Sequence, residues 1–256
     1  MTFDVPGDAY DRLIGRYSVS LAPLFADFAG VEPGMRVLDV GAGPGALAAE
    51  LARRLGAERV SAADSSEAFV AACRARVPGV DVRLAVAEEL PWEDGSFAAA
   101  LSQLVINFMK DAELGTRQMS RVVHAGGIVA ACTLDRGEGV QMLHVVAESA
   151  RALDLASPDD GPANRYRKPD ELDGLWRRAG LVDVETAPLV VEAGYEGFDD
   201  FWAGFLTGIG PDSAYVVSFD AERQDALREE CRRRLGSPTG RFTLEALVWA
   251  VRGRVP

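Results

Sequence analysis

A glycine-rich turn, and an acidic residue about 20 positions after it, are the groups best suited to ligand chemistry. The turn, Gly41-Ala42-Gly43-Pro44-Gly45, lies between an apolar run at residues 35–40 and a helix expected at residues 46–55. Glycine lets the backbone turn tightly and approach a ligand, and the N–H groups at a helix start point outward. The turn predicts a site for a nucleotide-type ligand, although glycine also serves turn geometry alone.

The acidic residue is Asp64, which follows a strand expected at residues 59–63. An acid at the carboxyl end of this strand can accept hydrogen bonds from both hydroxyls of an adenosine ribose. Asp64, Ser65 or Ser66 could instead cap the helix expected at residues 66–77. We favour the ribose, because a helix cap does not require an acid.

The same spacing is compatible with a second cofactor. Gly41, Gly43 and Ala46 also satisfy the dinucleotide fingerprint G-x-G-x-x-G/A. In that interpretation Asp64 would favour NAD over a nucleotide with a 2′-phosphate. The local pattern therefore leaves a nicotinamide oxidoreductase open beside other adenosine-bearing ligands.

Strand and helix patterns alternate along the first half of the chain. Short apolar runs predict strands, and amphipathic stretches predict helices, including two at residues 111–123 and 171–179. This alternation is typical of right-handed βαβ crossovers. We expect an α/β fold: a Rossmann-like, doubly wound, mostly parallel seven-stranded sheet with helices on both faces. Its strands are predicted at residues 35–40, 59–63, 80–86, 97–103, 128–134, 181–192 and 241–251.

The rhythm changes after residue 135. Helices are expected there at residues 140–155, and later at residues 198–206 and 221–235. We interpret residues 1–256 as a single domain with helical insertions after strands 5 and 6. Its parts are an N-terminal helical cap at 1–30, a cofactor-binding core at 31–135, and insertions at 136–180 and 193–240 that form a substrate lid.

Composition and charge exclude several classes of protein. The 256 residues include 48% hydrophobic and 26% charged residues, an ordinary balance for a globular chain. A net charge of -12 without a dense basic stripe argues against nucleic acid as a partner. No apolar run is long enough to span a bilayer, and the first residues are acidic, so we expect no membrane association and a cytoplasmic location. Cys73, Cys132 and Cys231 are too far apart to suggest a disulfide framework or a metal site.

Several longer stretches resemble a known family. The sequences VLDVGAGPG at 37–45 and ADSS at 63–66 look like the first two motifs of class I S-adenosylmethionine-dependent methyltransferases. The stretch at 87–97 and the one at 119–129, in which Gly126-Gly127 predicts a turn, resemble later motifs of the same family. Tyr10-Asp11-Arg12 and Gly15-Arg16-Tyr17-Ser18 look like the N-terminal cap of its small-molecule, ubiquinone/menaquinone-biosynthesis-like branch.

The resemblance implies S-adenosylmethionine as cofactor, S-adenosylhomocysteine as product, and a set of binding residues. The turn would hold the methionine portion together with Tyr17, the acid would hold the ribose, and Ala87 and Glu88 would border the adenine. One departure is Val86, where the family often has an acid, and another is Asn107, where relatives frequently have histidine. The expected cofactor contacts are Tyr17, Gly41, Ala42, Gly43, Asp64, Ser65, Ala87, Glu88, Ser102 and Gln103.

Our main hypothesis is methyl transfer from S-adenosylmethionine to a small or medium-sized metabolite, by a monomer or homodimer. The alternatives are an NAD-dependent oxidoreductase and a cofactor-binding protein without transferase activity. The sequence assigns no catalytic residue. His144 is a candidate base, but it shares a helical face with Gln141, Glu148 and Arg151, and such a face is more often solvated.

Overall fold

The structure is a computed structural model, described here for residues 11–155, 165–208 and 210–256. In this part of the chain, seven strands form one sheet in the order β3-β2-β1-β4-β5-β7-β6. All neighbouring strands are parallel except that β7 is antiparallel to both β5 and β6. The strands are β1 (Val37–Val40), β2 (Val60–Asp64), β3 (Asp81–Leu84), β4 (Phe97–Gln103), β5 (Val123–Leu134), β6 (Val182–Tyr195) and β7 (Phe242–Arg254). The predicted doubly wound, mostly parallel sheet is confirmed.

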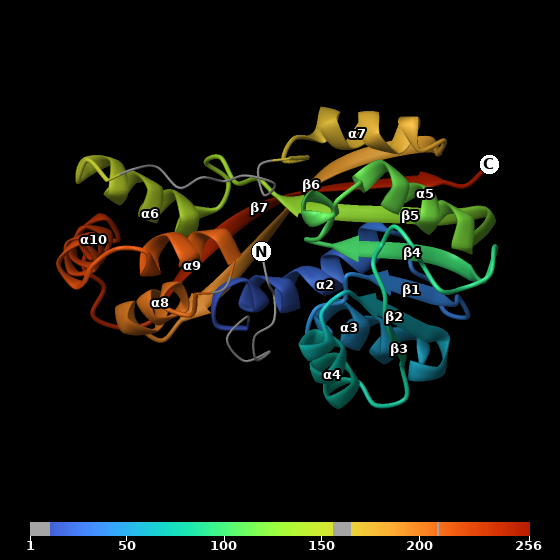
Figure 1. The fold of residues 1–256 in the computed structure, drawn as a ribbon, viewed down its shortest axis with the longest axis horizontal. Coiled ribbons are helices and arrows are strands. Elements are labelled where there is room, and N and C mark those ends of the chain that lie inside the picture. Colours follow the sequence, from blue (N-terminus) through green and yellow to red (C-terminus); the bar gives the residue numbers. More distant parts are fainter. Residues whose placement is uncertain (1–10, 156–164, 209) are drawn as a thin grey trace.

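Helices cover both faces of this sheet (Figure 1). Every residue of β1 and β2 is buried, as expected for parallel strands covered on both sides. On one face, Val37 of β1 packs in a cluster with the first helices, and on the other Leu38 packs with α5 and α7. The first face carries α2 (Arg16–Phe28), α3 (Ala46–Leu55) and α4 (Glu67–Arg76), and the second carries α5 (Ala112–Val122) and α7 (Pro169–Arg178).

Local sequence signals set several helix starts. The side chain of Ser66 accepts a hydrogen bond from Phe69 N at the start of α4, and Asp111 does the same for Leu114 N at the start of α5. These acceptors satisfy N–H groups that the first helical turn leaves unpaired. Short helical turns η1 (Asp11–Gly15), η2 (Ala57–Arg59) and η3 (Ile106–Phe108) complete the described helices. We call the sheet with the helices on its two faces the body.

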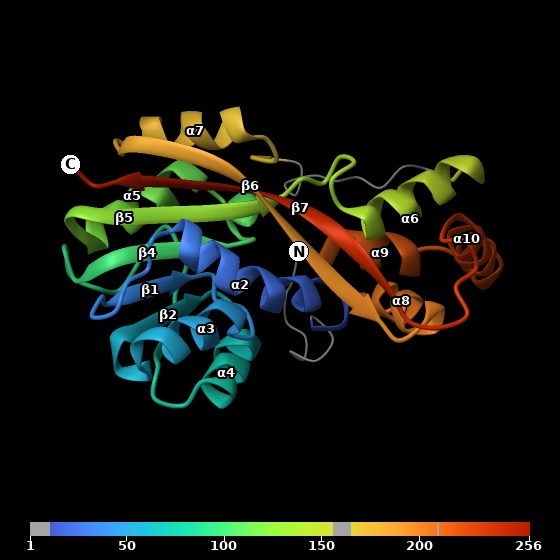
Figure 2. The ribbon, with the colours of Figure 1, turned by 180° about the vertical axis from the view of Figure 1, so that it is seen from behind.

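Beyond the edge of the body, β6 and β7 continue as a two-stranded ribbon (Figures 1 and 2). Helices pack around the ribbon, with α6 against α10 and β7, and α8 against α9 and β6. We call α6 (Gln141–Ala152), α8 (Phe198–Phe205), α9 (Gly210–Val217) and α10 (Ala221–Arg234) the helical lobe. One hydrophobic cluster runs from α2 and β1 into this lobe, so lobe and sheet share a continuous core.

The start of α2 is fixed to the lobe side of the ribbon. The Arg16 guanidinium pairs with Asp200 of α8 at 3.0 Å and lies 4.4 Å from the centre of the Tyr195 ring. The buried hydroxyls of Tyr17 and Tyr195 are 3.2 Å apart and share a hydrogen bond. The cap expected at residues 1–30 therefore joins body and lobe where it is described, whereas Tyr10 and the other residues before 11 lie outside the described part.

Three sequence expectations need correction. The turn predicted at Gly126-Gly127 is part of β5, because Gly126 N donates to Val255 O and Val255 N donates to Gly127 O. The helix α9 was not predicted from the sequence. The segment 136–180 divides: α6 joins the lobe, but α7 packs on the sheet beside α5. The sequence also predicts a polar loop at residues 157–169, of which residues 157–164 lie outside the described residues.

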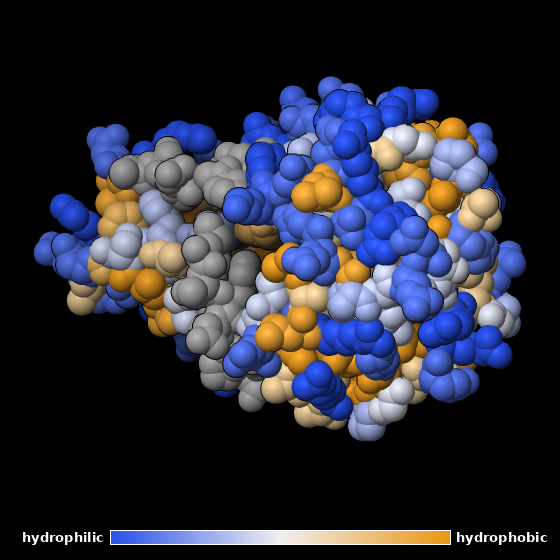
Figure 3. Space-filling model, turned by 45° about the vertical axis from the view of Figure 1, so that its right-hand side comes forward, coloured by the Kyte–Doolittle hydropathy of each residue, from blue (hydrophilic) through white to orange (hydrophobic). Residues whose placement is uncertain are grey.

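Charged and polar residues cover much of the outer surface. Figure 3 shows hydrophilic residues over most of one face of the body, with apolar residues in small patches between them. Among the described helices, none combines the length and apolar character needed to cross a membrane.

Candidate functional site

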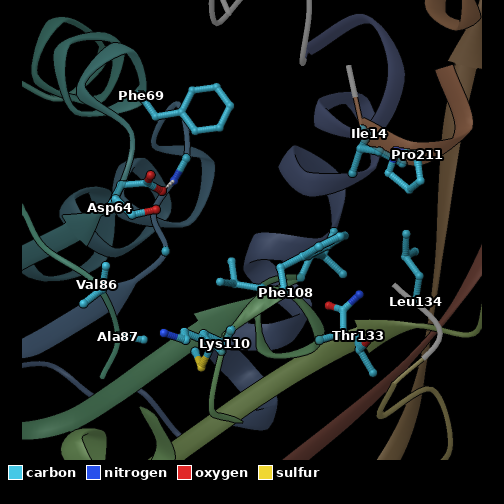
Figure 4. Close-up of a pocket in the computed structure, with 18 of the residues that line it drawn as sticks. Ile14, Asp64, Phe69, Val86, Ala87, Phe108, Lys110, Thr133, Leu134 and Pro211 are labelled. Atoms are coloured by element: carbon cyan, nitrogen blue, oxygen red, sulfur yellow. Dashed lines mark hydrogen bonds between the residues drawn. The ribbon is translucent and has the colours of Figure 1, made fainter. Parts of the chain in front are cut away.

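A cavity of about 390 Å³ lies where the carboxyl ends of the central strands meet the helical lobe (Figure 4). Doubly wound sheets bind ligands at this edge, and the volume falls in the range of small-molecule sites. The lining residues are Leu13, Ile14, Gly41, Gly43, Asp64, Ser65, Phe69, Ala85, Val86, Ala87, Glu88, Leu104, Val105, Asn107, Phe108, Met109, Lys110, Thr133, Leu134, Arg136, Gly210, Pro211 and Asp212.

The glycine turn forms one wall and is tied to β2. Gly41 N and Ala42 N both donate to Ala63 O, at 2.8 and 2.9 Å. Gly41, Gly43 and Gly45 have φ values of 75°, 53° and 93°, which glycine adopts without strain. The turn therefore needs glycine for its backbone shape, and two of its glycines also face the cavity.

Asp64 connects the turn to the cavity. Its Oδ2 accepts a hydrogen bond from Gly43 N at 2.8 Å, and its Oδ1 accepts one from Ser66 N at 2.9 Å. Burial raises the pKa of Asp64, and the backbone bonds from Ser66, Gly43 and Ser65 oppose this rise. A carboxylate offers about four acceptor positions, so these three bonds leave capacity for a ligand hydroxyl. Because the side chain of Ser66 caps α4, the capping role does not account for an acid here.

Figure 4 shows two ends of the cavity. Asp64, Phe69, Val86 and Ala87 surround one end, which we call the cofactor end. Ile14, Thr133, Leu134 and Pro211 surround the other, which we call the acceptor end, and Phe108 lies between the two. The cavity thus joins the predicted nucleotide-binding turn to a more apolar chamber beneath the lobe.

The structure brings together part of the expected binding set. Six of its residues line the cavity: Gly41, Gly43, Asp64, Ser65, Ala87 and Glu88. Tyr17, Ala42, Ser102 and Gln103 are buried behind the wall instead. Gln103 Nε2 donates to Ser18 O at 3.0 Å, which ties β4 to α2. These four are not among the described lining residues.

The candidate base His144 is absent from the described lining. It lies on α6, where neighbouring Gln141 accepts a hydrogen bond from Glu245 N and Glu148 pairs with Arg151. Gln141 and Arg151 are exposed and His144 and Glu148 are half-buried, so this face lies at the lobe surface. The solvated interpretation favoured by the sequence fits these contacts.

Residues that the sequence did not indicate line the acceptor end. Thr133 and Leu134 end β5, and the strand-end rule could have pointed to them. Pro211 and Asp212 come from α9, and no local sequence pattern predicted that this helix would line the cavity. In the described part of the chain, no group of three or more His, Cys, Asp or Glu side chains is arranged to hold a metal ion.

Asp39, at the base of the glycine turn, is fully buried in β1. Burial raises its pKa to about 8, and the nearby charge of Asp64 adds to the rise. The unfolded chain loses this proton near the ordinary aspartate pKa of about 4. Between these values the folded state binds more protons than the unfolded state, so the free energy of unfolding falls as pH rises.

We therefore expect Asp39→Asn to remove this pH dependence. We compare the unfolding free energy of the variant minus that of the wild type at two pH values. This difference should be larger at pH 9 than at pH 5 by at least about 1 kcal/mol, which is less than the free energy that corresponds to a shift of one pKa unit. Urea unfolding of both proteins across this pH range measures the difference. Parallel stability curves would show that Asp39 titrates normally.

Comparison with known proteins identifies the class to which this fold and turn belong. A family described as "Methyltransferase domain" matches residues 38–131. A ubiquinone biosynthesis O-methyltransferase of Mesorhizobium japonicum is 34% identical over 176 residues, 66% of this chain and 67% of that protein. The ubiquinone/menaquinone biosynthesis C-methyltransferase UbiE of Idiomarina loihiensis is 34% identical over 125 residues, 46% of this chain and 47% of that protein. The solved structure of the YcgJ protein from Bacillus subtilis shares the fold, with a TM-score of 0.56 at 17% identity over 91% of this chain and 97% of that one.

The sheet order and the glycine turn define a Rossmann-like cofactor-binding fold. Within it, the chain belongs to the class I S-adenosylmethionine-dependent methyltransferases. This membership decides between the two cofactors that the turn left open, in favour of S-adenosylmethionine. The chain covers between 47% and 67% of the length of the curated relatives compared above.

Proposed function

We propose that this chain transfers the methyl group of S-adenosylmethionine to a small or medium-sized metabolite. The observation that carries the proposal is the linkage of the glycine turn to Asp64, with Gly43 N 2.8 Å from its Oδ2, at the edge of a cavity that continues to an apolar end. This linkage brings the glycine backbone and a carboxylate to one point of the cavity wall, where an adenosine-bearing ligand can approach closely.

In this proposal the cofactor end holds the cofactor. Gly41 and Gly43 contact the methionine portion, Asp64 and Ser65 bind the ribose, and Ala87 and Glu88 border the adenine. Val86 cannot bond the adenine amino group through its side chain. Glu88 accepts a hydrogen bond from Asp111 N at 3.0 Å, which holds this part of the wall in place.

When bound, the cofactor supplies an electrophilic methyl carbon on a sulfonium. The residues of the chain then contribute orientation and the exclusion of water, which suit an in-line displacement. Among the described lining residues there is no His, Cys or Tyr, and the ionisable side chains are Asp64, Glu88, Lys110, Arg136 and Asp212. Phe108 lies between the two ends, where it would contact the bound cofactor.

We also propose that the chain is a single domain whose helical lobe is a substrate lid. The continuous hydrophobic cluster supports the single domain. Pro211 and Asp212 support the lid, because they bring α9 to the cavity opposite the sheet. The acceptor would then enter between the lobe and the ends of β4 and β5.

Isothermal titration calorimetry with S-adenosylmethionine, S-adenosylhomocysteine and NAD tests the cofactor. We expect binding of the first two and no heat with NAD at equal concentration. Methyl transfer is tested separately, with cofactor carrying a radiolabelled methyl group and a panel of phenols, amines and enolisable ketones. Absence of S-adenosylmethionine binding would overturn the proposal, whereas binding without labelled product from any acceptor would support a cofactor-binding protein without transferase activity.

A further inference from the structure

Two short segments of the chain meet at the cofactor end of the cavity. One is residues 85–88, which follow β3, and the other contains Met109 and Lys110, which precede α5. The segments approach each other at Gly115 of α5, where an added Cβ would lie 2.6 Å from Met109 Sδ and 3.4 Å from Ala87 Cβ. Glycine at this position therefore lets both segments line the same end of the cavity.

The backbone on either side of Lys110 is held by hydrogen bonds. Arg165 Nη2 donates to Met109 O at 2.7 Å, and Asp111 N donates to Glu88 Oε1 at 3.0 Å. Lys110 lies between these two anchored residues. Its side chain therefore starts from a defined place on the cavity wall.

The Lys110 side chain lines the cavity, and Figure 4 shows its amino end pointing toward Ala87. Lys110 is exposed, and within the described part of the chain its ammonium forms no hydrogen bond or ion pair. An ammonium carries three N–H donors and no acceptor. A ligand that offers an acceptor at this place would gain a charge-assisted hydrogen bond without displacing a described protein partner.

The neighbouring side chains differ from Lys110 in chemistry. Val86 and Ala87 offer apolar contact, and the carboxylates of Asp64 and Glu88 accept hydrogen bonds when they are ionised. Adenine has ring nitrogens that accept hydrogen bonds and an amino group that donates them. The two carboxylates therefore suit the ribose hydroxyls and the amino group, whereas the Lys110 ammonium suits a ring nitrogen.

We propose that the Lys110 ammonium donates a hydrogen bond to a ring nitrogen of the cofactor's adenine, and that Lys110 thereby helps to select the base. The inference rests on the proposed function, since it places the adenosine of S-adenosylmethionine at the cofactor end. The bond joins the protein to the base alone. It should therefore add affinity equally for any ligand that carries adenosine, whether or not the ligand has an amino-acid portion.

The first test removes the ammonium and keeps an unbranched apolar stem, with Lys110→Met. S-adenosylhomocysteine and 5′-methylthioadenosine, which has the same base and ribose but no carboxylate, are titrated calorimetrically into both proteins. We expect each ligand to bind the variant at least about fivefold more weakly, close to the net contribution of one hydrogen bond. Unchanged affinity for S-adenosylhomocysteine would overturn the proposal. A loss confined to S-adenosylhomocysteine would also overturn it, because Lys110 would then contact the carboxylate.

The second test identifies the acceptor atom. It uses the 1-deaza, 3-deaza and 7-deaza analogues of S-adenosylhomocysteine, in each of which a CH group replaces one ring nitrogen. We expect the wild type to bind one of them at least about fivefold more weakly than S-adenosylhomocysteine, and Lys110→Met to lose most of that difference. Equal binding of all four ligands by the wild type, or a difference that Lys110→Met retains in full, would overturn the proposal.

Lys168→Met is the matched control, because Lys168 is the other lysine of the chain, is exposed and lies outside the described lining. It should bind every ligand as the wild type does. If Lys110→Met does not fold, Lys110→Ala takes its place in both tests. Failure of the proposed function is distinguishable, because the wild type would then not bind S-adenosylmethionine, whereas failure of this proposal leaves wild-type binding intact.

Discussion

Gly41→Ala lowers the free energy of unfolding by about 2–5 kcal/mol, because a methyl group there is both strained and obstructed. Gly41 has φ 75°, and a Cβ built on it would lie 2.5 Å from Val105 Cγ1 and 2.9 Å from its Cβ. The branched Val105 cannot move all these atoms away together. Denaturant unfolding followed by circular dichroism measures the loss.

Gly43→Ala is the matched comparison within the same turn. Gly43 also has positive φ, at 53°, but a Cβ there meets no atom of the chain within 4 Å. It would project toward the space that we assign to the cofactor. We expect a stability loss of about 1–2 kcal/mol from backbone strain alone, with a larger loss of S-adenosylmethionine affinity than of stability. Equal destabilisation by the two substitutions would contradict the clash at Gly41, and unchanged affinity in Gly43→Ala would remove the turn from the proposed site.

Asp64→Ala weakens S-adenosylmethionine binding by about 1–3 kcal/mol, the scale of losing a charge-assisted hydrogen-bond partner. In dissociation constants this is about fivefold to 150-fold. Asp64→Asn keeps one oxygen as an acceptor but loses the charge, so its loss should be smaller. Calorimetric titration of both variants with the cofactor gives the values.

Asp64 also has a structural role, which the control experiments must separate from ligand binding. Because Asp64 also accepts from Gly43 N and Ser66 N, its removal loosens the turn as well as the ribose contact. Unfolding measurements on the same samples separate these effects. Asp173→Ala, which removes an exposed partner of Arg177 on α7, should leave cofactor affinity unchanged. A folded Asp64→Ala variant with wild-type affinity would exclude the ribose role.

Sequence reasoning located the sheet better than the lobe, for a physical reason. Strands buried on both faces are runs of apolar residues that end at glycine or acid, as in β1 and β2, and such runs are read locally. These strand ends predict the cavity wall that contains Gly41 and Asp64. Gly126-Gly127 belongs to β5 because both residues pair with Val255, far along the chain, although Gly126 keeps a turn-like φ of 77°.

The acceptor end depends on contacts that no local pattern encodes. Pro211 and Asp212 reach the cavity only because α9 packs against α8 in the lobe, at a long distance along the chain from the glycine turn. Arg136 lies 76 positions before Asp212, with which it pairs. Tyr17 was expected at the cofactor, but the hydroxyl of Tyr195 on β6 takes its hydrogen bond. Long-range packing therefore decides which polar residues face the ligand.

The position of β7 also predicts the order in which parts of the molecule fold. This strand is the last in sequence, yet it lies between β5 and β6 in the sheet. During synthesis from the N-terminus, β1 to β5 can pair as soon as they emerge, whereas β6 has no neighbour until residues 242–254 are made. We therefore expect the cofactor end to form on the nascent chain first, and the ribbon and the chamber beneath the lobe to close last.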